Sequence, residues 1–284
     1  MYEVRFCVKR KIIEILLIFS FQLNYIFSQE VKLGVQYNYP SEYGVLIIND
    51  DSYTMKSLDG KEGIKEETFK SKIEYKNNFK WLQNLDNPKN KYLILSCSYD
   101  DLEFLTLVCS RDTSENNYKN WEIYYNYHPD YKKLGSMPLL RGFDVIKADS
   151  FLTESLKNGK EIKYLPSITS ISNNPWAVKN NSAKKIIYLE PYSSLHDNKI
   201  IIANGFICVD KPYLYDQNSR AKKIKITWNS GSKEFELQDT PNFQIITLPC
   251  EEDAYDGILQ IEIMDAYLGS KYTDIVISGI YYIE

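Results

Sequence analysis

The segment KPYLYDQNSRAKKIKITW, residues 211–228, combines side chains of the kinds that bind sugars. It contains Tyr213 and Tyr215, followed by Asn218 and Arg220. An aromatic ring packs against the apolar C–H face of a sugar ring, while a planar amide or guanidinium group bonds paired hydroxyls. In an extended segment the two tyrosines would lie on one face and could act together. The segment therefore predicts a carbohydrate-binding loop that leads into a strand.

The same residues also allow a structural interpretation. The tyrosines would cap the core, and Asn218 would satisfy backbone groups of a turn. Arg220 would pair with a carboxylate such as Asp239, which stands in the turn-forming stretch QDTPNFQ. Asp239 is in addition a ligand-binding candidate of its own. The sequence leaves a binding loop and a structural corner both open.

Trp176 is a further candidate, because it follows a proline in the polar stretch NNPWAV. A tryptophan exposed in a loop would indicate contact with a ligand or a partner. A tryptophan that closes the base of a β-sandwich would have the same sequence context. Both interpretations stay open for Trp176.

The sequence contains few residue patterns that are typical of catalytic or metal-binding sites. Adjacent acids such as Asp100 and Asp101 stand between expected strands, where they are usually turn residues. The chain has 2 histidines, in polar or tyrosine-rich stretches, and no nucleophile elbow, P-loop or zinc-protease motif. Asp239, Asp265 and Asp274 lack the spacing of a calcium loop. We expect no enzyme activity, no catalytic residue, no metal site and no cofactor.

Composition bounds the fold class and the partners. The chain has 284 residues, with 24 Tyr and 12 Phe against 12 Gly, and aromatic residues favour pleated, half-buried surfaces. The formal net charge of -4 gives no basic footprint, so nucleic acid is not an expected partner. We expect a mostly β protein.

The amino end resembles a secretory signal. Basic residues 9–11 precede an apolar stretch, residues 12–21, and the small residue Ser28 precedes Gln29. The apolar run is shorter than the roughly 20 residues of a spanning helix. We expect cleavage after Ser28, no transmembrane anchor in the mature protein, and a secreted, periplasmic or cell-surface location. An uncleaved membrane anchor is the alternative.

The cysteines after this segment allow disulfides in an exported protein. Each pairing within one half of the chain, Cys97 with Cys109 and Cys208 with Cys250, would close a loop between strand-like segments. Buried free cysteines are equally compatible with the pattern.

Strand signals divide the mature chain into two units. YGVLIINDDSYTM, NKYLILSCSYD and DLEFLTLVCSRD predict hairpins within residues 29–142, a small antiparallel β domain of unknown role. The charged segment KEGIKEETFKSKIEYKNNFKWLQNLDNP fits a hairpin or a short helix. Residues 143–284 contain short strands separated by Pro, Gly, Asn and Asp, which predicts a jelly-roll β-sandwich.

The carboxy-terminal half also resembles a known family. SFLTE, IKYLP, NNPWAV, IIIANGF, KPYLYDQNSRAKKIKI, FELQDTPNFQIITLP and IEIMDAYLGSKYTDIVISGI look like the discoidin-like domain attached to bacterial NAD glycohydrolases. The resemblance covers about residues 149–280. It implies a galactose-binding-like, F5/8 type C sandwich that acts as a translocation or glycan-binding module, without the glycohydrolase itself.

Three functional hypotheses follow from these patterns. The first is non-catalytic recognition of a glycan or glycoconjugate by the end loops of the sandwich. The second is a structural or protein-interaction role, with the sandwich packed against the first domain or a surface protein. The third is an enzyme hidden in residues 31–143. The first requires Trp176 and the Tyr213 loop to lie at the same end of the sandwich.

Overall fold

The computed structural model describes residues 31–35, 45–59, 63–89, 91–99, 102–109, 121–126, 140–169, 175–193, 195, 198–249 and 257–283. The predicted signal segment, His128, His196 and Cys250 lie outside these residues. Within the described part of the chain, no helix has the length and apolar character needed to cross a membrane. Nearly all of the regular secondary structure in the described residues is β-strand, which confirms the predicted fold class.

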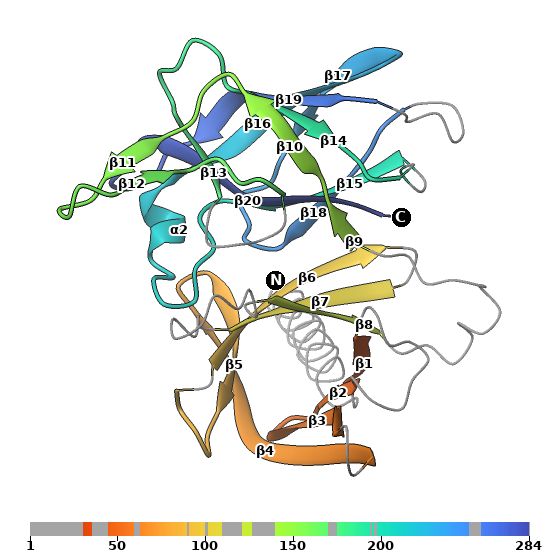
Figure 1. Ribbon diagram of the computed structural model, residues 1–284. Coiled ribbons are helices and arrows are strands. Elements are labelled where there is room, and N and C mark those ends of the chain that lie inside the picture. Colours follow the sequence, from red (N-terminus) through yellow and green to blue (C-terminus); the bar gives the residue numbers. More distant parts are fainter. Residues whose placement is uncertain are drawn as a thin grey trace, which may run out of the picture.

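The first part of the chain is a closed antiparallel barrel (Figure 1). Each strand pairs with the next, and β1 pairs with β8 to close the ring. This connectivity needs only hairpins and leaves no free sheet edge. The barrel strands are β1 (Val31–Val35), β2 (Val45–Ile48), β3 (Ser52–Asp59), β4 (Gly63–Lys76), β5 (Phe79–Asn84), β6 (Lys91–Tyr99), β7 (Leu102–Cys109) and β8 (Trp121–Asn126).

The charged segment, for which the sequence allowed either a hairpin or a short helix, forms the β4–β5 hairpin. Its turn is formed by Asn77 and Asn78, whose φ angles are 52° and 64°. Positive φ at both central residues defines the type I′ turn, whose twist matches that of paired strands, and asparagine tolerates this conformation. The Trp81 indole N–H donates to the Lys76 carbonyl at 3.0 Å across the base of the turn.

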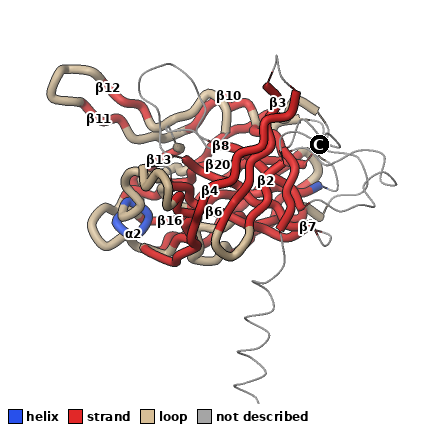
Figure 2. The backbone as a smooth tube through the Cα atoms, turned by 90° about the horizontal axis from the view of Figure 1, so that it is seen from below, coloured by secondary structure: helices blue, strands red, loops and turns tan. Residues whose placement is uncertain are grey.

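The remainder forms a β-sandwich, as predicted. Its strands are β9 (Leu140–Gly142), β10 (Asp144–Ala148), β11 (Thr153–Ser155), β12 (Glu161–Lys163), β13 (Trp176–Lys179), β14 (Ile186–Glu190), β15 (Lys199–Asn204), β16 (Ser219–Trp228), β17 (Gly231–Glu236), β18 (Phe243–Thr247), β19 (Leu259–Tyr267) and β20 (Asp274–Ile283). A short helix, α2 (Leu214–Gln217), precedes β16. The β11–β12 hairpin projects away from the sheets (Figures 1 and 2).

The strands of the sandwich form two layers that share β16. One layer contains β10, β14, β19, β16 and β17, and the other contains β13, β20, β15 and β18, with β9 on β20. Ser219 and Arg220 at the start of β16 pair in parallel with β20, and from Arg220 onward β16 pairs with β19 and, further along, with β17. Buried side chains between the layers, including Ile200, Ile226 and Ile261, form the sandwich core.

The barrel packs against the outer face of the β15–β18–β20 layer. Alternate residues of β15 point to opposite faces, so Ile200 and Ile202 enter the sandwich core while Ile201 turns toward the barrel. A second hydrophobic cluster joins Ile201 to Trp81 and Leu93 of the barrel. Leu82 and Ile94, the neighbours of these two residues in the chain, instead face the barrel interior. One sandwich layer is therefore buried on both faces.

The strand register decides against the Cys97–Cys109 bridge, one of the two alternatives that the sequence left open. Cys97 stands opposite Phe104, whereas Cys109 stands opposite Tyr92 at the other end of the hairpin. The two cysteines are therefore offset by five residues along the paired strands, which is about 17 Å at the usual rise per residue. A disulfide requires Cα atoms within about 7 Å, so this pairing does not fit. Cys208 is a free thiol in the structure.

Candidate recognition site

The loop that carries the predicted tyrosines is helical rather than extended. α2 is preceded by Tyr213, whose φ of -63° and ψ of -17° are already helical, and the Gln217 N–H donates to the Tyr213 carbonyl at 3.1 Å. Side chains two positions apart on a helix point in different directions. Tyr213 is accordingly 47% exposed and Tyr215 only 2%. The expectation that both tyrosines share one face was wrong.

Tyr215 is held over a glycine that sequence analysis missed. Gly205 has a φ of +90°, and a Cβ atom built on it would lie 2.5 Å from Cε2 of Tyr215. Only glycine adopts this backbone conformation at little cost and also lets the ring approach so closely. The ring of Phe79, at the start of β5 in the barrel, meets Tyr215 edge-on with centroids 5.4 Å apart. Tyr215 thus packs between the two parts of the protein.

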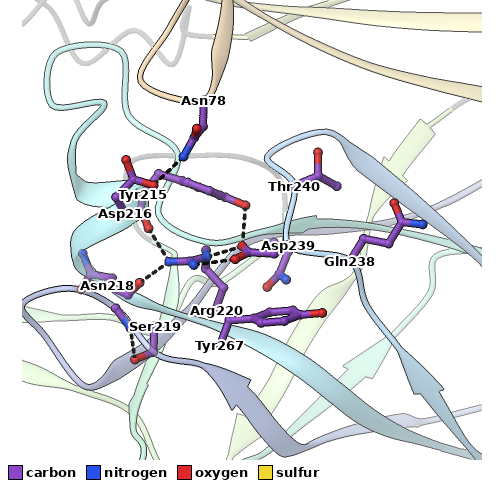
Figure 3. A network of polar contacts seen from close by, with 12 residues as sticks. Asn78, Tyr215, Asp216, Asn218, Ser219, Arg220, Gln238, Asp239, Thr240 and Tyr267 are labelled. Atoms are coloured by element: carbon purple, nitrogen blue, oxygen red, sulfur yellow. Dashed lines mark hydrogen bonds and ion pairs between the residues drawn. The ribbon is translucent and has the colours of Figure 1, made fainter.

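Arg220 makes the main ionic contact of this region (Figure 3). Its Nε donates to Asp239 Oδ1 at 2.6 Å and its Nη2 to Oδ2 at 2.8 Å, which is a two-bond guanidinium–carboxylate pair. Nη1 donates to the carbonyls of Tyr215 and Asn218 at 3.1 and 2.9 Å. The guanidinium carbon also lies 5.0 Å from the centroid of the Tyr215 ring. The ion pair expected by the structural interpretation is present.

Burial and charge both act on these groups. The Arg220 side chain is 8% exposed and that of Asp239 is 40% exposed, so water reaches only one end of the pair. The hydrogen bond to Asp239 raises the pKa of Arg220. Burial, with the nearby charge of Asp239, raises the pKa of the Tyr215 phenol, so the phenol stays neutral across the physiological range. We call Tyr215, Asn218, Arg220 and Asp239 the corner.

Asn218 and its neighbour Ser219 tie the corner to the β19–β20 loop. The side-chain amide of Asn218 donates to the Leu214 carbonyl at 2.9 Å. The Ser219 hydroxyl donates to the Tyr272 carbonyl at 3.2 Å and accepts from the Gly269 N–H at 3.1 Å. A Cβ atom on Gly269 would lie 2.4 Å from the Gln217 carbonyl oxygen, so the loop is pressed onto the end of α2.

Exposed side chains gather where this loop meets α2. Leu268 is 71% exposed and Tyr272 38%, and the Lys271 ammonium lies 5.0 Å from the centroid of the Tyr272 ring. A hydrogen bond with Tyr272 raises the pKa of Lys271, and the nearby Tyr213 phenol acts in the same direction. We call Tyr213, Leu268, Lys271 and Tyr272 the rim. Its aromatic and cationic groups are of the types that bind saccharides.

Trp176 does not belong to the rim. It begins β13, where it pairs with Ile277, and Ile277 also bridges to Gly205 on its other side. The tryptophan therefore lies near the same part of β20 as the corner. Its side chain is nevertheless 2% exposed, packs in the sandwich core and donates from its indole N–H to the Ser150 carbonyl at 3.1 Å. This burial matches the interpretation in which the tryptophan closes the sandwich.

The structure thus brings together most of the predicted binding residues. Tyr215 lies in α2, and Tyr213, Asn218, Arg220 and Asp239 lie around it, whereas Trp176 is a core residue. Sequence analysis considered Asp274 as a calcium ligand but missed Leu268, Lys271 and Tyr272, in the loop before it, as neighbours of α2. Among the described residues, no group of His, Cys, Asp and Glu side chains could hold a metal ion.

The segment that carries the corner and the rim also matches a known family. Residues 185–283 match the model of the NAD glycohydrolase translocation F5/8 type C domain. The predicted resemblance is confirmed. The matched segment begins near β14 and includes α2, the corner and the rim. β9–β13 precede the match but pair with strands inside it or with each other. The family that this segment matches is a family of non-catalytic translocation domains. A search of curated proteins found no match.

Proposed function

We propose that the protein recognises a carbohydrate or glycoconjugate through the rim, without catalysing a reaction. The observation that supports the proposal is the grouping of exposed Tyr213 and Tyr272 with Lys271 beside α2. Aromatic rings pack against the C–H face of a sugar, and an ammonium group donates to hydroxyl or carboxylate oxygens. The confirmed domain family and the signal-like amino end support action outside the cytoplasm, either secreted, periplasmic or at the surface.

In this proposal most of the predicted ligand residues support the site instead of contacting the sugar. Tyr215, Asn218 and Arg220 are buried and fix the backbone of α2. Tyr213 and Asp239 keep exposed surface and are the predicted residues that can meet a ligand directly. The proposal retains the two-domain division near residue 142, with the first domain in a supporting role.

A glycan-array screen of the purified protein tests the proposal. A shallow site of this kind should bind with a Kd in the high micromolar range, which corresponds to a binding free energy of about −5 kcal/mol. Tyr272→Ala should weaken binding about fivefold or more, because an aromatic–sugar contact is lost. Tyr192→Ala is the matched control, since Tyr192 is also exposed but lies at the opposite end of β20, where its backbone N–H donates to the Tyr282 hydroxyl. The absence of selective binding by the folded parent protein contradicts the proposal.

A second candidate is a structural or protein-interaction role. The hydrophobic cluster that joins β15, β18 and β20 to the barrel favours it, because this face of the sandwich already serves as a platform for another folded unit. In that case the array shows no selective binding, and a surface-protein partner is captured equally by the parent and by Tyr272→Ala.

A further inference from the structure

The β4–β5 hairpin of the barrel reaches the translocation domain at α2. Asn78, at the tip of the hairpin, donates from its side-chain amide to Asp216 Oδ1 at 2.6 Å. The next residue, Phe79, is fully buried and packs edge-on against the Tyr215 ring. Figure 3 shows Asn78 approaching Asp216 from the barrel, on the opposite side of α2 from Ser219. Two adjacent residues of the barrel thus contact two adjacent residues of α2.

Asp216 and the next residue of α2, Gln217, hold the rim loop through their backbone carbonyls. The Asp216 carbonyl accepts from the Ser270 N–H at 2.9 Å. The Gln217 carbonyl accepts from the N–H groups of Lys271 and Tyr272 at 3.2 and 2.7 Å. The position of the rim loop therefore depends on α2. A helix of 4 residues has little stability of its own, because nucleation costs more than one turn returns.

We propose that the barrel hairpin is a positioning element of the recognition site. Asn78 and Phe79 hold α2, and α2 holds Lys271 and Tyr272 of the rim. The barrel therefore contributes to binding without contacting the ligand. The consequence for binding rests on the proposed function of the rim, but the control of the rim by the hairpin does not.

The turn itself provides a clean variant and a matched control. Asn78→Gly removes the amide that bonds Asp216, and glycine adopts the positive φ of 64° without strain. Asn77→Gly makes the same chemical change one residue earlier, at a φ of 52°, and leaves the bond to Asp216 in place. Both variants should fold, since asparagine and glycine are the preferred residues of this turn type.

The first readout is hydrogen exchange at the amides of Ser270, Lys271 and Tyr272. These amides should exchange about three- to tenfold faster in Asn78→Gly, because the loss of a hydrogen bond to a charged group loosens α2. In Asn77→Gly, and in the β17 amides of both variants, exchange should stay at the parent rate. Equal rim exchange in the parent and in Asn78→Gly, or an equal effect of both variants, overturns the proposal.

The second readout is saccharide affinity, measured with the best ligand from the array. Asn78→Gly should weaken binding by a factor similar to its effect on exchange, and Asn77→Gly should not. A parent protein that binds no glycan, together with faster rim exchange in Asn78→Gly, refutes glycan recognition but supports control of the rim by the hairpin. Glycan binding that Asn78→Gly leaves intact, with unchanged exchange, refutes the hairpin proposal and supports the function.

Discussion

The two layers of the sandwich bury their strands differently. In β15 every residue from Ile200 to Asn204 is buried, because one face meets the sandwich core and the other meets the barrel. From Ile224 to Trp228, β16 alternates between buried and partly exposed residues, because the outer face of its layer meets solvent. An antiparallel strand with a continuous apolar run thus marks a sheet covered on both sides. The run KIIIAN carries this signal in the sequence.

A charge on the face of β15 that the barrel covers should have the largest effect on the free energy of unfolding. Ile201→Lys places an ammonium group at a fully buried position between β15 and the barrel. We expect a loss of about 4 kcal/mol or more in the free energy of unfolding, measured by urea denaturation. Gln260→Lys, on the open face of β19, is the control and should change this free energy by less than about 0.5 kcal/mol. Similar losses in both variants would show that the barrel does not seal the face.

A methyl group on Gly205 should have the second-largest effect on the free energy of unfolding. Gly205→Ala forces a Cβ atom against the Tyr215 ring, which Phe79 and Arg220 hold from other sides. We expect a loss of about 3 kcal/mol from overpacking and backbone strain together. Gly159→Ala separates the two causes, because its φ is +79° but nothing lies within 4 Å of its Cβ. Gly159→Ala should lower the free energy of unfolding by about 1 kcal/mol. Equal losses would place the whole effect in the backbone.

Neutralising the corner carboxylate should have a moderate effect. Asp239→Asn leaves Arg220, which is largely buried, without its ionic partner. Because Asp239 is 40% exposed and water screens the pair, we expect a loss of only about 1 to 2 kcal/mol. Asp265→Asn breaks the exposed pair with Lys222 and should leave stability unchanged within error. Unfolding curves of the two variants that coincide would contradict a partly buried corner.

The smallest effect concerns Tyr164, a partly buried residue directly after β12 at the base of the β11–β12 hairpin. Burial, with a hydrogen bond to Glu154, raises the pKa of Tyr164 to about 12. The unfolded value is about 10, so this stabilising contribution is present below pH 10 and is lost as the pH rises toward 12. The unfolding free energy of Tyr164→Phe should therefore fall less steeply between pH 10 and 11.5 than that of the parent. Parallel curves would contradict the shift.

Sequence analysis predicted the fold class and the family, because strand alternation and the discoidin-like segments are local signals. It placed Tyr213, Tyr215 and Arg220 in one region but assigned an extended backbone where α2 forms. It also missed the rim, because Lys271 and Tyr272 are brought to α2 by the β19–β20 loop, more than 50 residues further along the chain. Contacts between distant segments follow from tertiary packing, which residue spacing does not encode.

β20 follows the other strands of the sandwich in the chain and pairs with β9, β13, β15 and the start of β16. During synthesis the sandwich therefore cannot be completed until β20 leaves the ribosome, whereas the barrel needs only neighbouring strands that emerge earlier. We expect the barrel to close first and to keep Trp81 and Leu93 uncovered for that interval. Chains stalled before residue 257 should resist protease in the barrel and not in the sandwich. The order of the strands thus sets a period in which the nascent protein is most open to aggregation or to a chaperone.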